Sequence, residues 1–446
     1  MDLLVRNTTV VTMNGAREIL RGADVLIEGG TIAQVGKGLA RSRKIRQSLD
    51  ATDRVVIPGL VHGHLHACQT LFRNQADGLE LLDWLHQRIW PLEASHDEAS
   101  MNASAELTFA ELIRSGATAA LDMGTVRYTD VIFEVARRTG FRLTGGKSMM
   151  DDADQAPARL RETTSDSVAE SVRLARTWHG AAGGRLRYAL APRFALSCTE
   201  ELLREVATLA RALGVRVHTH ASESRAECDL VRQRTGCDTV EFLDSMGISG
   251  PQVTLAHCVW LTAPERQRLR DAGTVVCHCP SANLKLASGV APIPELIGDG
   301  VTVSLGADGA PCNNNLDMFT EMRLAALIHA PRAGPLALLP RTVLEMATLG
   351  GARALGLQAE IGSVEPGKRA DLTVLELSGP HATPGGDDPY GQLVYSARSA
   401  DVRDVIIDGR VVMRERELLT LEAAAVAERA RTHAARVAER ALALRR

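Results

Sequence analysis

Apolar and polar residues alternate at both ends of the chain. Residues 1–57 contain the stretches LLVRNTTVVTM, ADVLIEGGTIAQVG and ATDRVVIPGL, and residues 361–420 return to this pattern in DLTVLEL and DVRDVIIDGRVVM. A period of two is typical of strands that bury one face. We therefore predict that the two terminal segments together form one small β-sandwich domain.

Between residues 58 and 360, short apolar runs alternate with longer helical patterns. Capping-box spacings that begin at Ser95, Ser197 and Thr262 predict the first residues of three helices. The candidate strands are the runs VVIPGLVHGH, ATAALDM, RLTGGKSMMD, RLRYALAPR, VRVHTHASE, QVTLAHC, TVVCHCP and VTVSLGAD. Eight β–α units predict an α/β fold with a (β/α)8 TIM-type barrel, although a doubly wound sheet can show a similar alternation.

The composition narrows the choice of partners. Lys and Arg (51) nearly balance Asp and Glu (54) in the 446 residues, so the formal charge is only -3. This balance argues against nucleic-acid and membrane partners and favours a small-molecule substrate. The eight cysteines form no disulfide pattern and the N-terminus has no signal-peptide pattern, so we expect a cytoplasmic protein. The Ala- and Arg-rich residues 421–446 predict a terminal helix, whose surface leads us to expect a homo-oligomer.

Side chains that can bind a metal gather at the predicted strand ends. His64 and His66 are two residues apart on an extended segment, so both rings lie on one face and could hold one ion. His62 shares this face and competes with them. A polar strand end satisfied by backbone is the simpler reading of such a pair, but other strand ends offer similar groups. These are His220, Glu223, His257, His278 and Asp308.

These motifs make the chain resemble the amidohydrolase superfamily, in its cytosine deaminase and chlorohydrolase-like branch. The matching segments lie between about residues 3 and 413: PGLVHGHLH, HASE, AHC, HCPSANLKLASG and LGADGAPCNNNLDMF. The resemblance implies one divalent metal ion, zinc or alternatively iron. It implies as its ligands His64, His66, His220 and Asp308, whereas His62 stands where relatives carry Asn.

The resemblance also implies the chemistry, a hydrolase that acts on C–N bonds in cyclic amidines. Hydroxide attacks the amine-bearing ring carbon, Glu223 and Asp308 shuttle protons, and His257 polarises the attacking group. Relatives with two metals use a lysine at the end of the fourth strand, and here that strand ends in Leu190-Ala191-Pro192-Arg193. The sequence therefore favours deamination at a mononuclear centre.

The substrate is predicted from residues near the first strand. Trp84 and Glu93 have the spacing found in deaminases of 5′-modified adenosines, such as 5′-deoxyadenosine, methylthioadenosine and S-adenosylhomocysteine. The resemblance implies that Trp84 packs on the ligand and that Glu93 binds ribose hydroxyls. The product is then the inosine analogue and ammonia. This subgroup supplies the leading hypothesis for the substrate.

Two other residues resemble guanine deaminases instead. Gln69 and Arg193 match positions that suit a ring carbonyl and its neighbouring edge. Lys147 is predicted as a second cation near the ligand, and Arg159 as the partner of a carboxylate tail. Deamination of guanine or another 2-amino-4-oxo purine or pterin, and hydrolysis of a triazine, therefore stay open. A barrel without catalysis that acts as a binding protein is the alternative from outside the enzymes.

Overall fold

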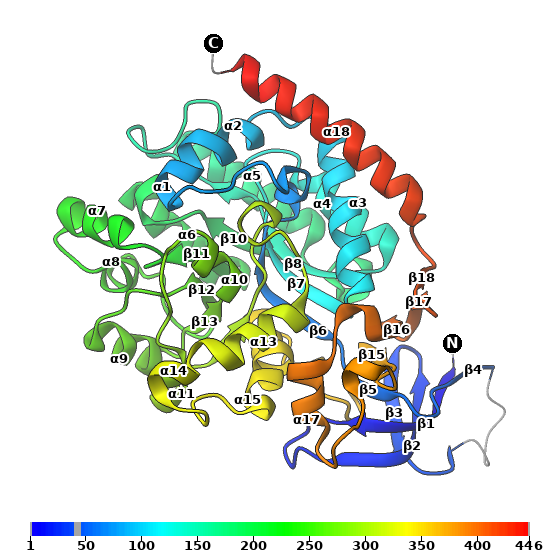
Figure 1. Ribbon diagram of the computed structural model, residues 1–446. Coiled ribbons are helices and arrows are strands. Elements are labelled where there is room, and N and C mark those ends of the chain that lie inside the picture. Colours follow the sequence, from blue (N-terminus) through cyan, green and yellow to red (C-terminus); the bar gives the residue numbers. More distant parts are fainter. Residues whose placement is uncertain (1, 40–45, 445–446) are drawn as a thin grey trace.

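The main body of the molecule is a parallel barrel whose strands match the eight predicted runs. The computed structural model describes residues 2–39 and 46–444 (Figure 1). Neighbouring strands pair in parallel in the order of the sequence, and Leu65 bridges Asp308 to join the last strand to the first. The strands are β6 (Leu60–Leu65), β7 (Ala117–Met123), β8 (Arg142–Gly146), β10 (Leu186–Pro192), β11 (Arg216–Ala221), β12 (Val253–His257), β13 (Val275–His278) and β14 (Val303–Leu305). The predicted (β/α)8 barrel is confirmed.

Helices cover the outside of the barrel and connect its strands. Their bounds are α3 (Glu98–Arg114), α4 (Thr129–Thr139), α5 (Thr164–Trp178), α6 (Glu200–Leu213), α7 (Arg225–Thr235), α8 (Thr239–Ser245), α9 (Ala263–Ala272), α10 (Pro280–Lys285), α11 (Ile293–Gly298), α12 (Ala310–Asn313), α13 (Met318–Ile328), α14 (Ala330–Ala333), α15 (Pro340–Glu345) and α16 (Gly351–Ala354). Two short helices, α1 (Leu81–Trp84) and α2 (Trp90–Glu93), precede α3, and β9 (Ser148–Met149) pairs with β10.

One of the three predicted helix starts is confirmed and two are wrong. Thr262 caps α9 with the expected capping box. At α3 the cap is Asp97, because the Ser95 hydroxyl donates to the carbonyl of Pro91 instead. At α6 the cap is Thr199, because Ser197 lies in a preceding 3-10 turn. Nearby Ser, Thr and Asp residues compete for the same cap, and the spacing alone does not choose among them.

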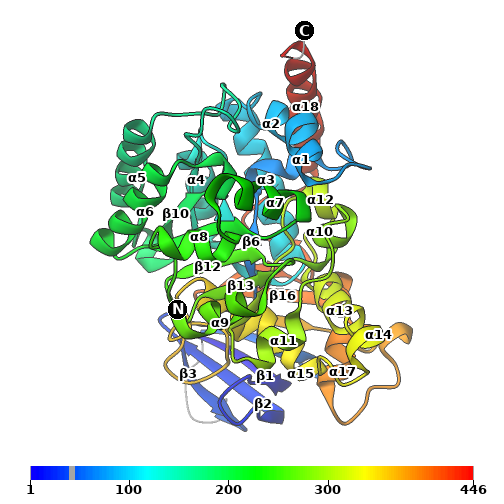
Figure 2. The same cartoon turned by 90° about the vertical axis from the view of Figure 1, so that its left-hand side faces the viewer.

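Strands from both ends of the chain together form a second sheet. Its strands are β1 (Leu3–Val11), β2 (Ile19–Glu28), β3 (Thr31–Gly36), β4 (Gln47–Asp50), β5 (Val55–Pro58), β15 (Leu372–Leu375), β16 (Val402–Ile407), β17 (Arg410–Arg414) and β18 (Glu417–Leu418). The antiparallel pair of β5 with β15 joins the two terminal segments. Inward residues such as Val25, Leu372 and Ile406 share a hydrophobic core of their own. Both terminal segments thus contribute to one small β domain, as the sequence predicted. Figure 2 shows this sheet at one end of the molecule.

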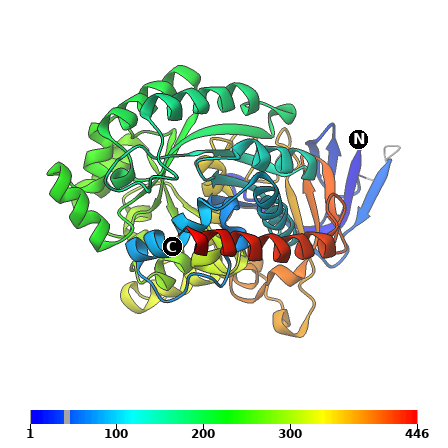
Figure 3. The ribbon, with the colours of Figure 1, turned by 90° about the horizontal axis from the view of Figure 1, so that it is seen from above.

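The chain ends in the long helix α18 (Ala423–Ala443), which lies alongside α3 (Figures 1 and 3). Val426 and Val437 bury its apolar face, and Arg429 pairs with Glu106 of α3 at 2.7 Å. A short helix, α17 (Pro389–Gly391), lies between β15 and β16. Within the described part of the chain, every helix is too short or too polar to cross a bilayer.

Candidate active site

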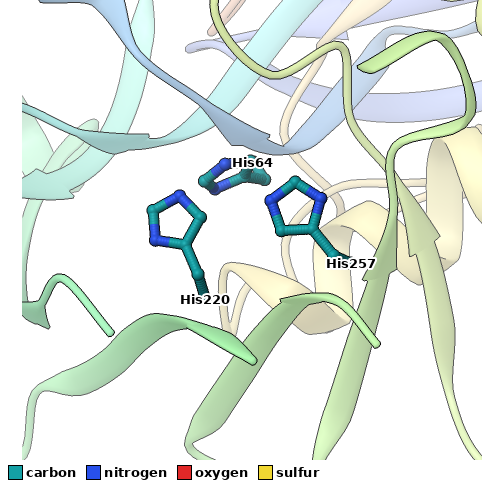
Figure 4. Close-up of side chains that lie close together, drawn as sticks. All are labelled: His64, His220 and His257. Atoms are coloured by element: carbon teal, nitrogen blue, oxygen red, sulfur yellow. The ribbon is translucent and has the colours of Figure 1, made fainter. Parts of the chain in front are cut away.

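Three histidines and one aspartate meet inside the barrel at the carboxyl ends of its strands. The Nε2 atoms of His66 and His220 are 3.2 Å apart, and the Asp308 carboxylate lies 3.3 Å from His64 Nε2 and 3.5 Å from His66 Nε2. The ligand atoms of His64, His66 and Asp308 all lie within 4.8 Å of one another, as do those of His64, His220 and His257. Figure 4 shows the rings of the second group turned toward one centre.

The outer nitrogen of each ring has a hydrogen-bond partner that fixes its orientation. His66 Nδ1 donates to the carbonyl of Met123 at 2.7 Å, and His220 Nδ1 donates to the carbonyl of Arg193 at 2.6 Å. Because both protons sit on Nδ1, both Nε2 atoms carry lone pairs that face each other. His64 Nε2 and His257 Nε2 are buried and make no hydrogen bond of good geometry among the described residues, although a carboxylate oxygen lies 3.3 Å from each, that of Asp308 from His64 and that of Glu223 from His257.

This arrangement fits a metal ion. Two lone pairs at 3.2 Å repel each other unless a cation lies between them. Nitrogens about 2.0–2.1 Å from a tetrahedral ion are about 3.3 Å apart, which is the spacing of His66 and His220. Outer hydrogen bonds that fix the tautomer are typical of metal-binding histidines. The described residues therefore form a candidate metal centre with nitrogen and carboxylate ligands.

The electrostatics keep the histidines neutral and Asp308 ionised. Burial lowers the pKa of His66 to about 3, and it lowers the pKa of His220 well below the usual range. Burial alone would raise the pKa of Asp308, but the imidazole of His64, whose Nε2 lies 3.3 Å away, holds it well below its usual range. Neutral imidazoles and an ionised carboxylate are the forms that bind metal.

Glu223 also lies beside this centre, but its pKa is shifted in the opposite direction to that of Asp308. Its Oε2 is 3.3 Å from His257 Nε2, and its backbone N–H donates to Glu227 at 2.6 Å. Burial, and then the negative charge of Asp308, raise the pKa of Glu223 well above its usual range. The helix start next to it is capped by Ser224, so Glu223 is free of that structural role. A buried carboxyl whose pKa is raised keeps its proton to higher pH and is therefore suited to donate it.

A narrow cavity opens above the metal-binding groups. Its free space is about 20 Å³, so in this conformation it holds about one water, and a larger ligand requires wall residues to move aside. Trp84, which the sequence predicts to pack on the ligand, is one of these wall residues. Arg193 is the one Lys or Arg side chain that lines the cavity in the described part of the chain. The lining residues are His66, Leu81, Trp84, Leu85, Arg193, Phe194, His220, Glu223, Glu227, His257 and Asp308.

Gln69, Glu93 and Arg193 form one buried network. Arg193 donates to both carboxylate oxygens of Glu93 at 3.1 and 3.2 Å, and Gln69 donates to the same carboxylate at 2.8 Å. Thr125 adds a fourth hydrogen bond at 2.9 Å. The carboxylate is therefore fully engaged, and only Arg193 of the three predicted residues reaches the cavity wall. The sequence treated them as separate ligand contacts, and the structure brings them together as one unit.

Lys147 and Arg159 do not join the site. Lys147 is buried, forms an ion pair with Glu162 and donates to Ser167 at 3.1 Å, outside the cavity lining. Arg159 is exposed in a turn and is absent from the lining as well. The structure gives no support to either residue as a substrate contact. The reason is that side-chain direction just after a strand depends on loop packing, which the pattern of the sequence does not define.

Two other histidines from the predicted strand ends lie beside the centre. His62 is buried and accepts from the backbone N–H of Ala307 at 3.3 Å, and burial lowers its pKa to about 3. His278 faces His329 with ring centroids 5.6 Å apart. Neither belongs to the two groups whose ligand atoms converge.

Three supporting residues were missed in the sequence. His218 Nε2 lies 2.8 Å from His64 Nδ1, and Asn283 accepts from His257 Nδ1 at 2.9 Å. Asp122 accepts from the backbone N–H of Ala67 at 2.7 Å, next to His66, and burial raises its pKa to about 7. The spacing of His218 and His220 repeats that of His64 and His66, so it could have identified His218. The position of Asp122 at a strand end was a similar signal.

The barrel and the convergent side chains at its carboxyl end define a barrel hydrolase with a candidate metal centre. Comparison with known proteins shows to which family this barrel hydrolase belongs. Residues 55–412 match the model of the Amidohydrolase family. The chain therefore belongs to the amidohydrolase family.

The relatives are similar over nearly the full length. A 5′-deoxyadenosine deaminase of Methanosarcina acetivorans is 39% identical, covering 99% of this chain and 99% of its own. A 5-methylthioadenosine/S-adenosylhomocysteine deaminase of Moorella thermoacetica is 37% identical over 94% of this chain and 96% of its own. Among solved structures, an adenosine deaminase from Xanthomonas campestris with bound zinc has a TM-score of 0.92 and 32% identity, covering 98% and 99% of the two chains.

Proposed function

We propose that the protein is a hydrolytic deaminase that converts a 5′-modified adenosine and water into the inosine analogue and ammonia. The observation that carries the proposal is the pair of opposed Nε2 lone pairs of His66 and His220, with Asp308 and the buried Glu223 beside them. The names of the similar proteins support the substrate class, because they include deaminases of 5′-deoxyadenosine, methylthioadenosine and S-adenosylhomocysteine.

One divalent ion is proposed at this centre, zinc first and iron as the alternative. His64, His66, His220 and Asp308 would hold it, as the opposed nitrogens and the ionised carboxylate support. When bound, such an ion lowers the pKa of a coordinated water toward neutrality. His257 keeps its proposed role beside the reacting water, because its Nε2 points at the same centre and its Nδ1 is held by Asn283.

The protein's own groups move the protons. Asp308, ionised and within reach of the reacting water, accepts its proton. Glu223 holds a proton because burial raises its pKa, so it donates to a ring nitrogen as the water oxygen adds to the amine-bearing carbon. The proton held by Asp308 then passes to the amine, which leaves as ammonia, while the hydroxyl proton of the adduct returns to Glu223 and restores both groups. The ring carbon thereby exchanges its C–N bond for a C–O bond, without oxidation or reduction.

Substrate contacts are proposed for Trp84 and Arg193. Trp84 lines the cavity, and its aromatic face suits a purine ring. Arg193 presents the remaining N–H groups of its guanidinium, while Glu93, fixed by Gln69 and Thr125, holds it in place. Direct binding of ribose hydroxyls by Glu93 stays a prediction, because it requires Gln69 or Arg193 to release the carboxylate.

A panel of substrates tests the proposal. Metal-loaded protein would be assayed for ammonia with 5′-deoxyadenosine, methylthioadenosine, S-adenosylhomocysteine, guanine, a pterin and an aminotriazine. We expect release from at least one of the adenosine derivatives, with far lower kcat/KM for the other rings. Release from guanine alone would overturn the substrate class, and no release from any compound would overturn the deaminase itself.

A homo-oligomer and a cytoplasmic location are further proposals. The apolar face of α18 is already covered by α3 of the same chain, so an oligomer would use another surface. Light scattering of the purified protein would give the number of subunits.

A further inference from the structure

A second polar cavity opens at the opposite end of the barrel from the metal centre. It has a volume of about 560 Å³ and lies where β10 and β11 begin and where α5 and α6 end. Its polar walls come from Thr144, His179, Arg187, Arg211, Arg216 and Gln252. Three arginines in one cavity make it strongly cationic.

The charges of these arginines are only partly neutralised. Arg187 pairs with Glu360. Within the described part of the chain, no carboxylate lies within ion-pair distance of Arg211 or Arg216. Burial lowers the pKa of Arg216 to about 10, and no neighbouring carboxylate opposes this effect. The cavity thus holds two guanidinium groups that lack an anionic partner.

Buried hydrogen-bonding atoms in the same cavity also lack partners. Arg216 donates through one nitrogen to the carbonyl of Pro251 at 3.0 Å, but its Nε has no acceptor in the described structure. The Thr144 hydroxyl is almost fully buried and likewise has no partner there. A Cβ on Gly356 would lie 2.9 Å from a terminal nitrogen of Arg216, so glycine leaves room for the guanidinium. Such donors are costly to bury unless an acceptor binds them.

A structural role explains part of this cluster. Arginines near helix C-termini interact favourably with the last carbonyls, and α5 and α6 both end at this cavity. That role accounts for an exposed side chain such as Arg211. It does not account for the unpaired Nε of Arg216 or the unpaired hydroxyl of Thr144, both of which belong to residues that line this cavity.

We propose that this cavity binds a tetrahedral oxyanion, namely inorganic phosphate or the phosphoryl group of a phosphomonoester. The planar fork of a guanidinium matches phosphate oxygens, and several forks around one cavity suit an anion with several oxygens better than a single carboxylate. The site is separate from the catalytic centre and does not depend on the identity of its substrate.

The test is calorimetric titration of the metal-loaded full-length protein with inorganic phosphate, at constant ionic strength maintained with chloride. Saturable binding of phosphate is expected, and chloride alone should give none. A second titration with ribose 5-phosphate, which carries no purine ring, distinguishes the two sources. Tighter binding than free phosphate assigns the site to a phosphomonoester, and weaker binding assigns it to the free ion.

Variants locate the binding. Arg216→Gln should weaken it about 10- to 100-fold, because a charge-assisted hydrogen bond contributes that much. Arg211→Gln should weaken it less, and this exposed position keeps the test usable if the first variant fails to fold. Arg204→Gln on the same helix α6, where Arg204 pairs with Glu200 at 3.4 Å, is the control and should change nothing. Absence of saturable binding, or unchanged binding in both test variants, overturns the proposal.

Discussion

Two buried charged clusters in this protein differ in whether their hydrogen bonds are satisfied. Where β8 meets the terminal sheet, Arg142 donates to both carboxylate oxygens of Asp371 at 2.7 and 2.9 Å, and the backbone N–H of Asp408 donates to the same carboxylate at 2.8 Å. At the candidate metal centre, by contrast, His66 and His220 oppose two lone pairs, and His64 Nε2 makes no hydrogen bond of good geometry in the described structure, although Asp308 lies 3.3 Å away.

The difference separates a structural role from a chemical one. Burial alone would lower the pKa of Arg142, but Asp371 raises it above its usual value, so the pair is complete without any ligand. The opposed nitrogens of the histidine cluster would be satisfied by a cation between them, as the proposed metal ion would provide. Four variants test this distinction, in order of their expected effect on turnover.

Removal of a predicted metal ligand should have the largest effect. His220→Asn should lose its metal and reduce turnover to background, because the remaining ligands no longer surround one ion. Metal content and ammonia release measured on the same sample check this result. The matched control is His96→Asn, since His96 is also buried but both of its ring nitrogens have partners, Ser100 and the Cys68 carbonyl. If the control also lost its metal, the loss in His220→Asn would reflect general damage.

Glu223→Gln should retain the metal and lower kcat by about 10²–10⁴. The amide keeps the size of the side chain but cannot transfer the proton that burial holds on the carboxyl. Steady-state kinetics with metal analysis give the answer. Full activity in this variant would exclude the proton-transfer role.

Loss of an outer partner should have a moderate effect. His218→Leu removes the group 2.8 Å from His64 Nδ1, so metal affinity or activity should fall about 10- to 100-fold. Titration with a competing chelator measures the affinity. An unchanged affinity and rate would show that His64 is oriented by its packing alone.

Arg142→Met should leave metal content and turnover of the folded protein unchanged. It should lower the free energy of unfolding by about 3–5 kcal/mol, because Asp371 then remains buried without its partner. Urea unfolding measures this loss, and Arg142→Met with Asp371→Leu should recover part of it. A fall in kcat without a fall in stability would contradict the division between the two clusters.

The sequence was a good guide to the barrel and to the groups of the metal centre. Short apolar runs with chemical residues at their ends identified all eight strands. His64 belongs to both groups of converging ligand atoms, with His66 and Asp308 in one and His220 and His257 in the other, and the choice of ligands among them stays a prediction. All strands of a parallel barrel point the same way, so a residue at the carboxyl end of any strand lies at the same end of the barrel. Residues far apart in the sequence can therefore be predicted to meet from the pattern around each strand.

Contacts between side chains from different loops could not be predicted from the sequence. Nothing in the local pattern around Arg193 shows that it pairs with Glu93, one hundred residues earlier. Lys147 follows a strand like the other predicted site residues, yet its side chain pairs with Glu162. Such pairings depend on loop conformation, for which a single sequence contains little information.

The most direct test of the metal centre is anomalous X-ray scattering from crystals of the metal-loaded protein. One ion is expected per chain, in contact with Nε2 of His64, His66 and His220 and with the carboxylate of Asp308. An ion bound elsewhere, or none at these four residues in active protein, would contradict the proposal that their unpaired nitrogens form the catalytic metal site.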